Sequence, residues 1–182
     1  MSTDGPAIYV PLALLSTWPR NYRRGHIEKI ARSIQRFGFN QDIRIRERII
    51  YAGNHAFLAL RMLQEQGEAI PHRIVADPAG GWLVPCIDIG HLNQSEAEAY
   101  AIADNRLNEL GENDDEALAA VLSDIAREDE DLFDATGFEI DDLHEMIGYE
   151  EPELDDSPEI TAEIASKVKR ATCPECGHEF PL

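Results

Sequence analysis

The fold is decided by a stretch near the start of the chain in which a helical pattern gives way to a strand pattern. It reads Ile27-Glu28-Lys29-Ile30-Ala31-Arg32-Ser33-Ile34-Gln35-Arg36-Phe37-Gly38 and continues through Asp42-Ile43-Arg44-Ile45-Arg46. Apolar residues at helical spacing predict an amphipathic helix from His26 to Phe37, with Gly38 as its left-handed C-cap. Alternating isoleucine and arginine predict a half-buried strand from Asp42 to Arg48.

The segments around this stretch extend it into an α/β unit. Before it we expect a short strand and a basic loop. After it we expect a strand that completes a hairpin, a helix closed by Gly67, and two more strands around a glycine-rich turn. In chain order these elements cover residues 8–12, 18–25, 49–52, 55–66, 72–76 and 83–89.

The second half of the chain is predicted to be helical and acidic. A capping box at Ser95-Glu96-Ala97-Glu98 predicts a helix that runs to about Leu110, and helical patterns also cover residues 115–127 and 139–147. The acidic, proline-flanked residues 150–159 predict a flexible linker before a short helix and a cysteine motif. We therefore expect an N-terminal domain, a helical extension, a linker and a tail, at residues 8–110, 111–149, 150–160 and 161–182.

The net charge of −19 at pH 7 argues against a polyanionic ligand, but the charge is unevenly distributed. Residues 1–60 hold nine Lys/Arg and four Asp/Glu, whereas residues 61–182 hold seven and thirty-one. The first third is thus a basic region of its own.

No apolar run is long enough to cross a bilayer, so we expect no membrane insertion. Residues 1–6 lack the features of a secretory signal, which predicts a cytoplasmic protein.

The basic third carries two candidate phosphate-binding motifs. The loop Arg20-Asn21-Tyr22-Arg23-Arg24 combines guanidinium groups with the free amides of the helix that follows, and phosphate is the natural ligand of such a set. In Gly53-Asn54-His55 a strand ends in glycine and a helix begins at once, which lets backbone amides approach an anion. Each motif has an alternative interpretation. The first would be a solvated basic loop paired with the acidic half of the chain, and the second a tight turn in which Asn54 is an ordinary N-cap.

A third motif, Asp104-Asn105-Arg106, interrupts the apolar pattern of the predicted helix 95–110. A carboxylate, an amide and a guanidinium together suit Mg²⁺ and a phosphate, but they also suit salt bridges that tie this helix to the basic third. The remaining basic candidates, which we expect to face nucleic acid, are Arg32, Arg36, Arg44 and Arg46.

In their order and separation, these motifs resemble the N-terminal domain of the ParB and sulfiredoxin-like superfamily, especially the phage and plasmid ParB-like proteins. The resemblance covers residues 8–110 and extends more weakly to Gly148. It rests on Asn21-Tyr22-Arg23-Arg24, on residues 30–43, 50–59 and 102–107, and on Asp134-Ala135-Thr136-Gly137-Phe138. It implies an α+β fold with a small mixed sheet, followed here by an acidic helical region and a short cysteine-knuckle tail.

The resemblance also implies a pocket for a nucleotide or for DNA phosphate, with Mg²⁺ near an acid and an amide. Matching positions here are Asn21 and Arg23, Gly53 and Ala59, and Asp104 and Asn105, with Asp104 in place of a glutamate. The full set of expected phosphate-binding residues is Arg20, Asn21, Arg23, Arg24, Gly53, Asn54, His55, Asp104, Asn105 and Arg106.

Two positions depart from the family pattern. Ala56 stands where an arginine is usual, which weakens the case for triphosphate chemistry, and His55 or Arg24 is a candidate for part of the lost charge. Asn54 occupies the place of the sulfiredoxin cysteine, so we do not expect thiol-based peroxiredoxin repair. The kinase branch of the superfamily transfers phosphoryl groups with a carboxylate base. Glu28 is a poor candidate for that base, so we rank kinase activity third among the activities of the superfamily.

The tail contains Cys173-Pro174-Glu175-Cys176-Gly177-His178, a spacing typical of one half of a zinc knuckle. A second Cys-x-x-Cys is absent from the sequence, so Zn²⁺ would need His178 and a distant ligand, or the tail of another protomer. Two interpretations stay open: an intact site in a dimer or complex, and a degenerate or unmetallated remnant. Cys86 is expected to be a small core residue.

The sequence leaves three functions open. The leading hypothesis is a phage- or plasmid-related ParB-like module that associates with nucleic acid or a nucleotide, as a DNA-binding or DNA-modification accessory protein. A nucleotide hydrolase of the CTPase type or a nuclease would use the same pocket with Mg²⁺. An acidic interaction protein would dock a basic partner that acts on DNA, such as a DNA-modifying enzyme. Homo-oligomerisation is compatible with each, and catalytic residues are not assigned.

Overall fold

A mixed β-sheet organises the first part of the chain in the computed structural model, which describes residues 7–149 and 170–181. Its strands are β1 (Ile8–Pro11), β2 (Ser16–Thr17), β3 (Ile43–Arg46), β4 (Ile49–Ala52), β5 (Val75–Ala76) and β6 (Trp82–Asp88). The strand order is β1-β6-β3-β4-β2, with β5 paired to β6. The pairs β3–β6 and β2–β4 are parallel and the other pairs are antiparallel, which confirms the expected mixed sheet.

The predicted hairpin is formed by β3 and β4. Their register pairs Arg46 with Ile49. Glu47 and Arg48, the two residues between the strands, both have positive φ, of 53° and 66°, as a tight hairpin turn requires. Ile43 and Ile45 point into the core while Arg44 and Arg46 stay partly exposed, so the alternating sequence pattern matches the two faces of the strand.

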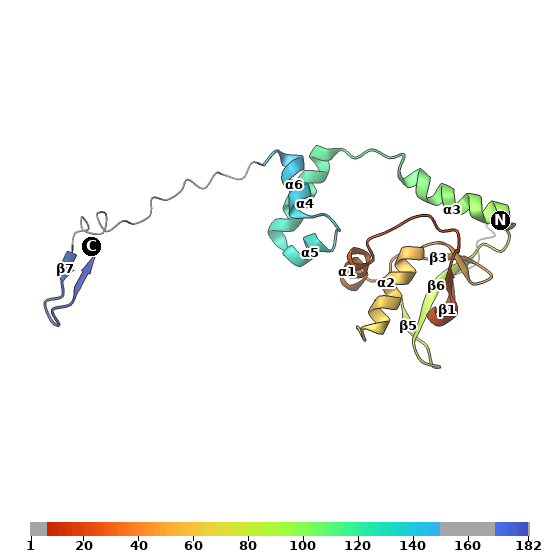
Figure 1. Ribbon diagram of the computed structural model, residues 1–182, viewed down its shortest axis with the longest axis horizontal. Helices are drawn as coiled ribbons and strands as arrows, with labels where there is room; N and C mark the ends of the chain where they lie inside the picture. Colours follow the sequence, from red (N-terminus) through yellow and green to blue (C-terminus); the bar gives the residue numbers. More distant parts are fainter. Residues whose placement is uncertain (1–6, 150–169, 182) are drawn as a thin grey trace. The chain divides into compact units, whose positions relative to one another are not determined.

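Two helices cover one face of this sheet: α1 (Ile27–Phe37) and α2 (Asn54–Glu65), which lie side by side in Figure 1. Between helices and sheet lies the main core, which includes Ile34, Ile43, Ile50, Leu60 and Val84. Both helices are within one or two residues of their predicted bounds. The short 3₁₀ turn η1 (Leu12–Leu14) and the strand β2 were not predicted, because two or three residues give no readable periodicity.

The prediction for Gly38 is only partly correct. Its φ is +82°, but its ψ is 176°, so the residue is not in the left-handed helical region. Directly after Gly38, the Phe39 amide donates to the His72 carbonyl at 3.0 Å. A Cβ on Gly38 would lie 2.7 Å from His72 Cβ, so the end of α1 depends on the absence of a side chain.

The helix α3 (Gln94–Asn108) packs on the other side of the sheet through a second cluster, formed by Trp18, Tyr51, Ile89, Ala97 and Ala101. The predicted capping box at Ser95 was wrong. Asn93 is the N-cap: its side chain accepts from the Glu96 amide at 3.1 Å, and the Glu96 carboxylate accepts from the Asn93 amide at 2.8 Å. Glu98, which was assigned to the box, pairs with Arg20 instead.

A third cluster joins α4 (Asp115–Glu128), α5 (Glu130–Asp134) and α6 (Ile140–Ile147) through Ala119, Leu122, Phe133 and Leu143. The helix α5 was missed because its five residues are fewer than two turns. None of the helices in the described residues is long and apolar enough to span a membrane.

Residues 149–182 form a second unit, in which β7 (Arg170–Thr172) and β8 (Glu179–Pro181) pair as an antiparallel hairpin. The predicted linker at 150–160 and the predicted short helix after it lie outside the described residues. The proposed domain boundaries therefore stay predictions.

Two glycine substitutions separate backbone strain from steric conflict. Gly38→Ala should lower the free energy of unfolding by roughly 2–4 kcal/mol, because it combines a positive φ with the clash against His72. Gly67, with φ of +75°, has nothing within 4 Å of a built Cβ, so Gly67→Ala should cost only about 1–2 kcal/mol. Urea unfolding measures both, and equal losses would show that the approach of His72 imposes no constraint.

Candidate functional site

The three sequence motifs meet at one cavity of about 220 Å³. Asn21 and Arg23 come from the loop between β2 and α1, Gly53 to Ala56 from the junction of β4 and α2, and Asp104 and Asn105 from α3. The remaining lining residues are Ile30, Gln41, Tyr51 and Ala52. Segments more than eighty positions apart in the sequence thus share one concave surface.

The basic loop is anchored directly to the start of α2. Trp18 stacks on Tyr51 of β4, with ring centroids 5.9 Å apart. The Trp18 amide donates to the Asn54 side-chain oxygen at 3.2 Å, and the Asn21 amide donates to the Trp18 carbonyl at 3.0 Å. Asn54 is 7% exposed and is the one buried polar residue among those described. Its side chain therefore holds the loop beside the helix terminus.

The start of α2 leaves backbone amides available at the cavity. Gly53 is the N-cap in a left-handed conformation, with φ of +91°, and no side chain caps this terminus. The Asn54 side-chain oxygen accepts from the Trp18 amide and does not cap the helix. The backbone amides of Asn54, His55 and Ala56 therefore have no side-chain acceptor. Such a terminus carries a partial positive charge and suits an anion. The predicted anion-binding turn thus lines the cavity, and Asn54 is not the N-cap of the alternative interpretation.

His55, Asn21 and Arg23 also line a neighbouring cavity of about 370 Å³. The His55 ring nitrogen Nε2 lies 3.4 Å from the Arg23 carbonyl oxygen. A Cβ on Gly25 would lie 2.7 Å from the His55 ring, so the glycine lets the loop pass against the histidine. Arg24 lines the second cavity and has no side-chain partner among the described residues.

Arg23 is held at the cavity by Glu109, the C-cap of α3, in an ion pair between its guanidinium Nη1 and the carboxylate. The hydrogen bond from Arg23, supported by a weaker contribution from Arg106, keeps the pKa of Glu109 below its ordinary value. The pair is complete at neutral pH and is lost only as the pH falls through that lowered pKa. An incoming anion would therefore compete with Glu109 for Arg23.

The third motif contributes two of its three residues to the cavity. Asp104 accepts a hydrogen bond from the Tyr100 hydroxyl at 3.3 Å, and the Asn105 side chain donates to the Ala101 carbonyl at 2.8 Å. Burial and the neighbouring Asp104 charge raise the pKa of Tyr100, so its hydroxyl remains a donor. Arg106 lies outside the cavity and pairs with Glu109 at 3.5 Å.

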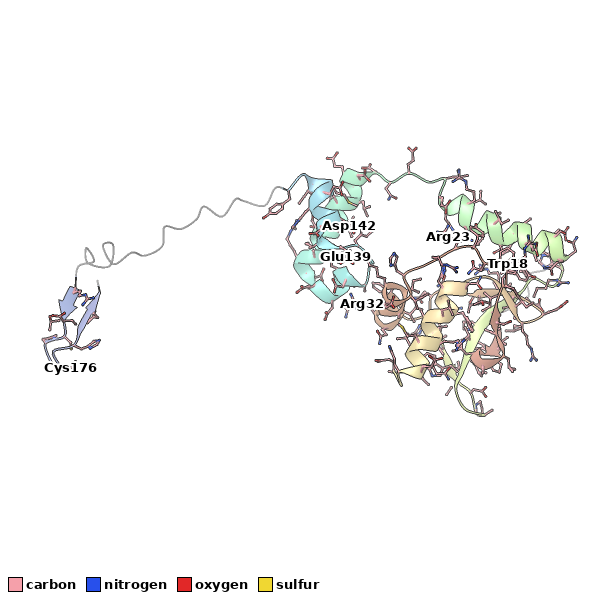
Figure 2. All side chains as sticks on the ribbon, in the orientation of Figure 1. Trp18, Arg23, Arg32, Glu139, Asp142 and Cys176 are labelled. Carbon is pink, nitrogen blue, oxygen red and sulfur yellow. The ribbon has the colours of Figure 1, made fainter. Side chains whose placement is uncertain are left out.

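The other basic candidates are engaged in contacts within the chain. Arg20 pairs with Glu98 at 2.6 Å, Arg36 with Asp129 at 2.5 Å and Arg32 with Asp134 at 3.7 Å. Lys29 of the same helix pairs with Glu139 at 2.7 Å and donates to the Gly137 carbonyl at 2.9 Å. Figure 2 labels Arg32 on α1 and Glu139 just before α6. At these positions the basic residues therefore pair with carboxylates of the acidic half, as the alternative interpretation expected.

Arg44 and Arg46 on β3 also have partners. The Arg44 guanidinium donates to the Asp42 carbonyl at 2.5 Å, and Arg46 donates to the Leu92 carbonyl at 3.2 Å and pairs with Glu47 at 3.3 Å. Neither residue lines either cavity. Their predicted contact with nucleic acid stays a prediction.

The cysteine motif forms the turn between β7 and β8, where Figure 2 labels Cys176. The Cys173 amide donates to the His178 carbonyl, and the Gly177 amide donates to the Cys173 carbonyl, both at 2.9 Å. Hydrogen bonds from the backbone of Cys176 and Glu175 lower the pKa of the Cys173 thiol. Over residues 7–149 and 170–181, no set of three His, Cys, Asp or Glu side chains is placed to hold a metal ion, at this turn or at Asp104.

Sequence reasoning missed residues whose partners are distant in the chain. Trp18 and Tyr51 lie within stretches that the sequence singled out, but their role in positioning the loop was not predicted. Glu109, which pairs with Arg23, lies outside every motif. The available signal was the single tryptophan before the basic loop, next to Pro19. Gly25 also carried a signal, as a glycine directly before a helix that it does not cap.

The electrostatic arrangement around Arg23 can be measured by NMR titration of the Glu109 carboxyl carbon. Arg23→Gln should raise the Glu109 pKa toward its ordinary value, because the main hydrogen bond is lost while the weaker contribution of Arg106 remains. Arg106→Gln is the matched control and should raise it less, since Arg106 is the weaker partner. A shift in Arg106→Gln as large as in Arg23→Gln would contradict the assigned ion pair.

No family model matches this chain, and no curated protein matches it. Among solved structures, the chain is similar to the C-terminally truncated chromosome-partitioning protein ParB from Caulobacter crescentus complexed with CTP-gamma-S. The similarity covers 80% of this chain and 73% of that chain, with 18% sequence identity and a TM-score of 0.49.

Proposed function

We propose that the cavity binds the phosphate groups of a nucleotide. The observation that carries this proposal is the convergence of three separate segments, 21–23, 53–56 and 104–105, on one small cavity. Each segment carries groups suited to phosphate or Mg²⁺: an arginine, a helix N-terminus and a carboxylate with an amide. Their convergence is expected for a binding site and is not required by the packing of the core.

The chemistry of the lining suits an anion. The free amides at the start of α2 and the Arg23 guanidinium act together there, and a charge-assisted hydrogen bond from arginine is about twice as strong as a neutral one. Arg24 lines the adjoining cavity, and no described carboxylate pairs with its guanidinium group. It supplies a further positive charge from the adjoining cavity, where it compensates for alanine at position 56.

The size of the site favours a nucleotide over a duplex. The cavity of about 220 Å³ is small for a whole ligand, since ligand pockets commonly measure about 300–1,000 Å³. The adjoining cavity of about 370 Å³ shares Asn21, Arg23 and His55 with it, so the phosphates would occupy the first cavity and the sugar and base the second.

The charges outside the cavity point to the same ligand class. Duplex DNA is bound through an extended set of lysine and arginine contacts to phosphate. On α1 that set is already neutralised by Asp129, Asp134 and Glu139, and the chain as a whole carries −19. A role beside a DNA-modifying enzyme, and a phage or plasmid origin, stay predictions.

Mg²⁺ is part of the proposal through Asp104. Its carboxylate is the acidic group that lines the cavity, and Mg²⁺ is commonly held by one or two carboxylates together with substrate phosphates. A single carboxylate is therefore sufficient only when a nucleotide supplies the other oxygens. If the bound nucleotide is hydrolysed, the same carboxylate would position the metal at the phosphates.

Calorimetric titration with the four ribonucleoside triphosphates and with inorganic triphosphate, each with and without Mg²⁺, tests the proposal. At least one should bind, and Arg23→Gln should weaken that binding about 10- to 100-fold, because one charge-assisted hydrogen bond contributes roughly 1.5–3 kcal/mol. Asp104→Asn should remove the dependence on Mg²⁺ while metal-free binding remains.

Arg61→Gln provides the control. Arg61 lies on the same helix α2, pairs with Glu65 and lines neither cavity, so its variant should bind as the wild type does. The proposal fails if none of these compounds binds, or if Arg23→Gln and Arg61→Gln have equal affinities.

A further inference from the structure

Over the residues that the structure describes, the hairpin β7–β8 has no core of its own. Among its described side chains none is buried, and Phe180 is 42% exposed. A two-stranded hairpin is at best marginally stable in water, and small units without a core are usually held by disulfides, metals or association. The two cysteines at its turn are free thiols, so no disulfide closes it.

The turn presents both cysteines in the geometry of a metal-binding knuckle. Gly177 has a φ of +73°, and its amide closes the turn on the Cys173 carbonyl. The backbone of Glu175 and Cys176 donates to the Cys173 sulfur, as second-shell amides do for metal-bound thiolates. Cys173 is half-buried and Cys176 is exposed, so both sulfurs can reach a metal.

Two sulfurs are only half of a structural zinc site, which has four ligands. His178 is the remaining nitrogen or sulfur side chain of the turn, but in the described residues it forms no group of three with the cysteines. The third cysteine of the chain, Cys86, is fully buried in the core of the first unit, and burial raises its pKa to about 12. It is therefore neither accessible nor deprotonated.

We propose that Cys173 and Cys176 bind Zn²⁺ together with the same two cysteines of a second copy of this chain. A twofold axis through the metal then supplies four equivalent thiolates in a tetrahedron, which is the closed ligand set of a structural zinc site. Four thiols lose four protons when one Zn²⁺ binds, so the site carries a charge of −2. The proposal is independent of the nucleotide site and explains why a hairpin with no buried side chain is formed.

The full-length chain, purified in reducing buffer with zinc supplied, is the material for the test. We expect about 0.5 zinc per chain by mass spectrometry, and X-ray absorption showing four sulfurs at about 2.3 Å. By light scattering, the zinc-loaded species should have twice the 20.4 kDa mass of one chain, and a chelator should return it to the monomer. Cys173→Ser and Cys176→Ser should each remove the metal and the dimer.

His178→Ala is the matched control, because it lies in the same turn but is not a ligand in this proposal. It should keep the four-sulfur spectrum and the zinc content of the wild type. Three results would overturn the proposal: no zinc bound by the reduced chain, one zinc per monomer, or loss of zinc in His178→Ala. Nucleotide binding by the Cys173→Ser variant should be unchanged, so a failure of either proposal can be distinguished from a failure of the other.

Discussion

The site depends on the junction at which β4 passes into α2. Gly53 adopts a left-handed conformation there, and a Cβ at this position would approach Ile43 Cγ1 to 3.3 Å. The turn lets α2 begin directly behind the strand, with its first amides at the cavity. Asn54 then uses its side chain to hold Trp18, and through Trp18 the whole basic loop. One glycine and one buried asparagine thus place two of the three motifs.

Charge pairing determines which basic residues remain for a ligand. The positive groups on α1 meet carboxylates from the region around α5, and Arg20 meets α3. Exposed ion pairs contribute little to stability, commonly below about 1 kcal/mol, so their main effect here is to neutralise a surface. Arg24 is left without a carboxylate, and Arg23 is paired with one that an anion can displace. The acidic half of the chain therefore neutralises most of the positive charge of the basic third, and the charge that remains for a ligand lies at Arg23 and Arg24.

Local patterns allowed much of the fold to be predicted. The periodicity of α1 and α2 and the alternation in β3 are properties of neighbouring residues, and these elements were found close to their observed bounds. The strand order was beyond such patterns, since β1 and β3 both pair with a strand about forty or more residues later in the chain. The cap of α3 was misplaced by two residues because Ser95 and Asn93 are both good N-caps, and each has a glutamate three residues later.

The three motifs of the candidate site could be identified from the sequence, but which of their residues share one cavity could not. Motifs identified one at a time included Arg106, which lies outside the cavity, because a helix motif does not show which of its residues face inward. They omitted Glu109, whose effect appears only once the end of α3 is placed beside the loop. The arginines of α1 were assigned to nucleic acid for the same reason: their acidic partners lie about ninety or more residues away.

The proposed phosphate site joins the start of α2 to the loop at Arg23. Titration of the labelled chain with inorganic triphosphate, followed in amide NMR spectra, should therefore give saturable shifts at Gly53, His55 and Ala56 together with Asn21 and Arg23. Shifts confined to the basic face of α1, or no saturable shift at the start of α2, would contradict this proposal.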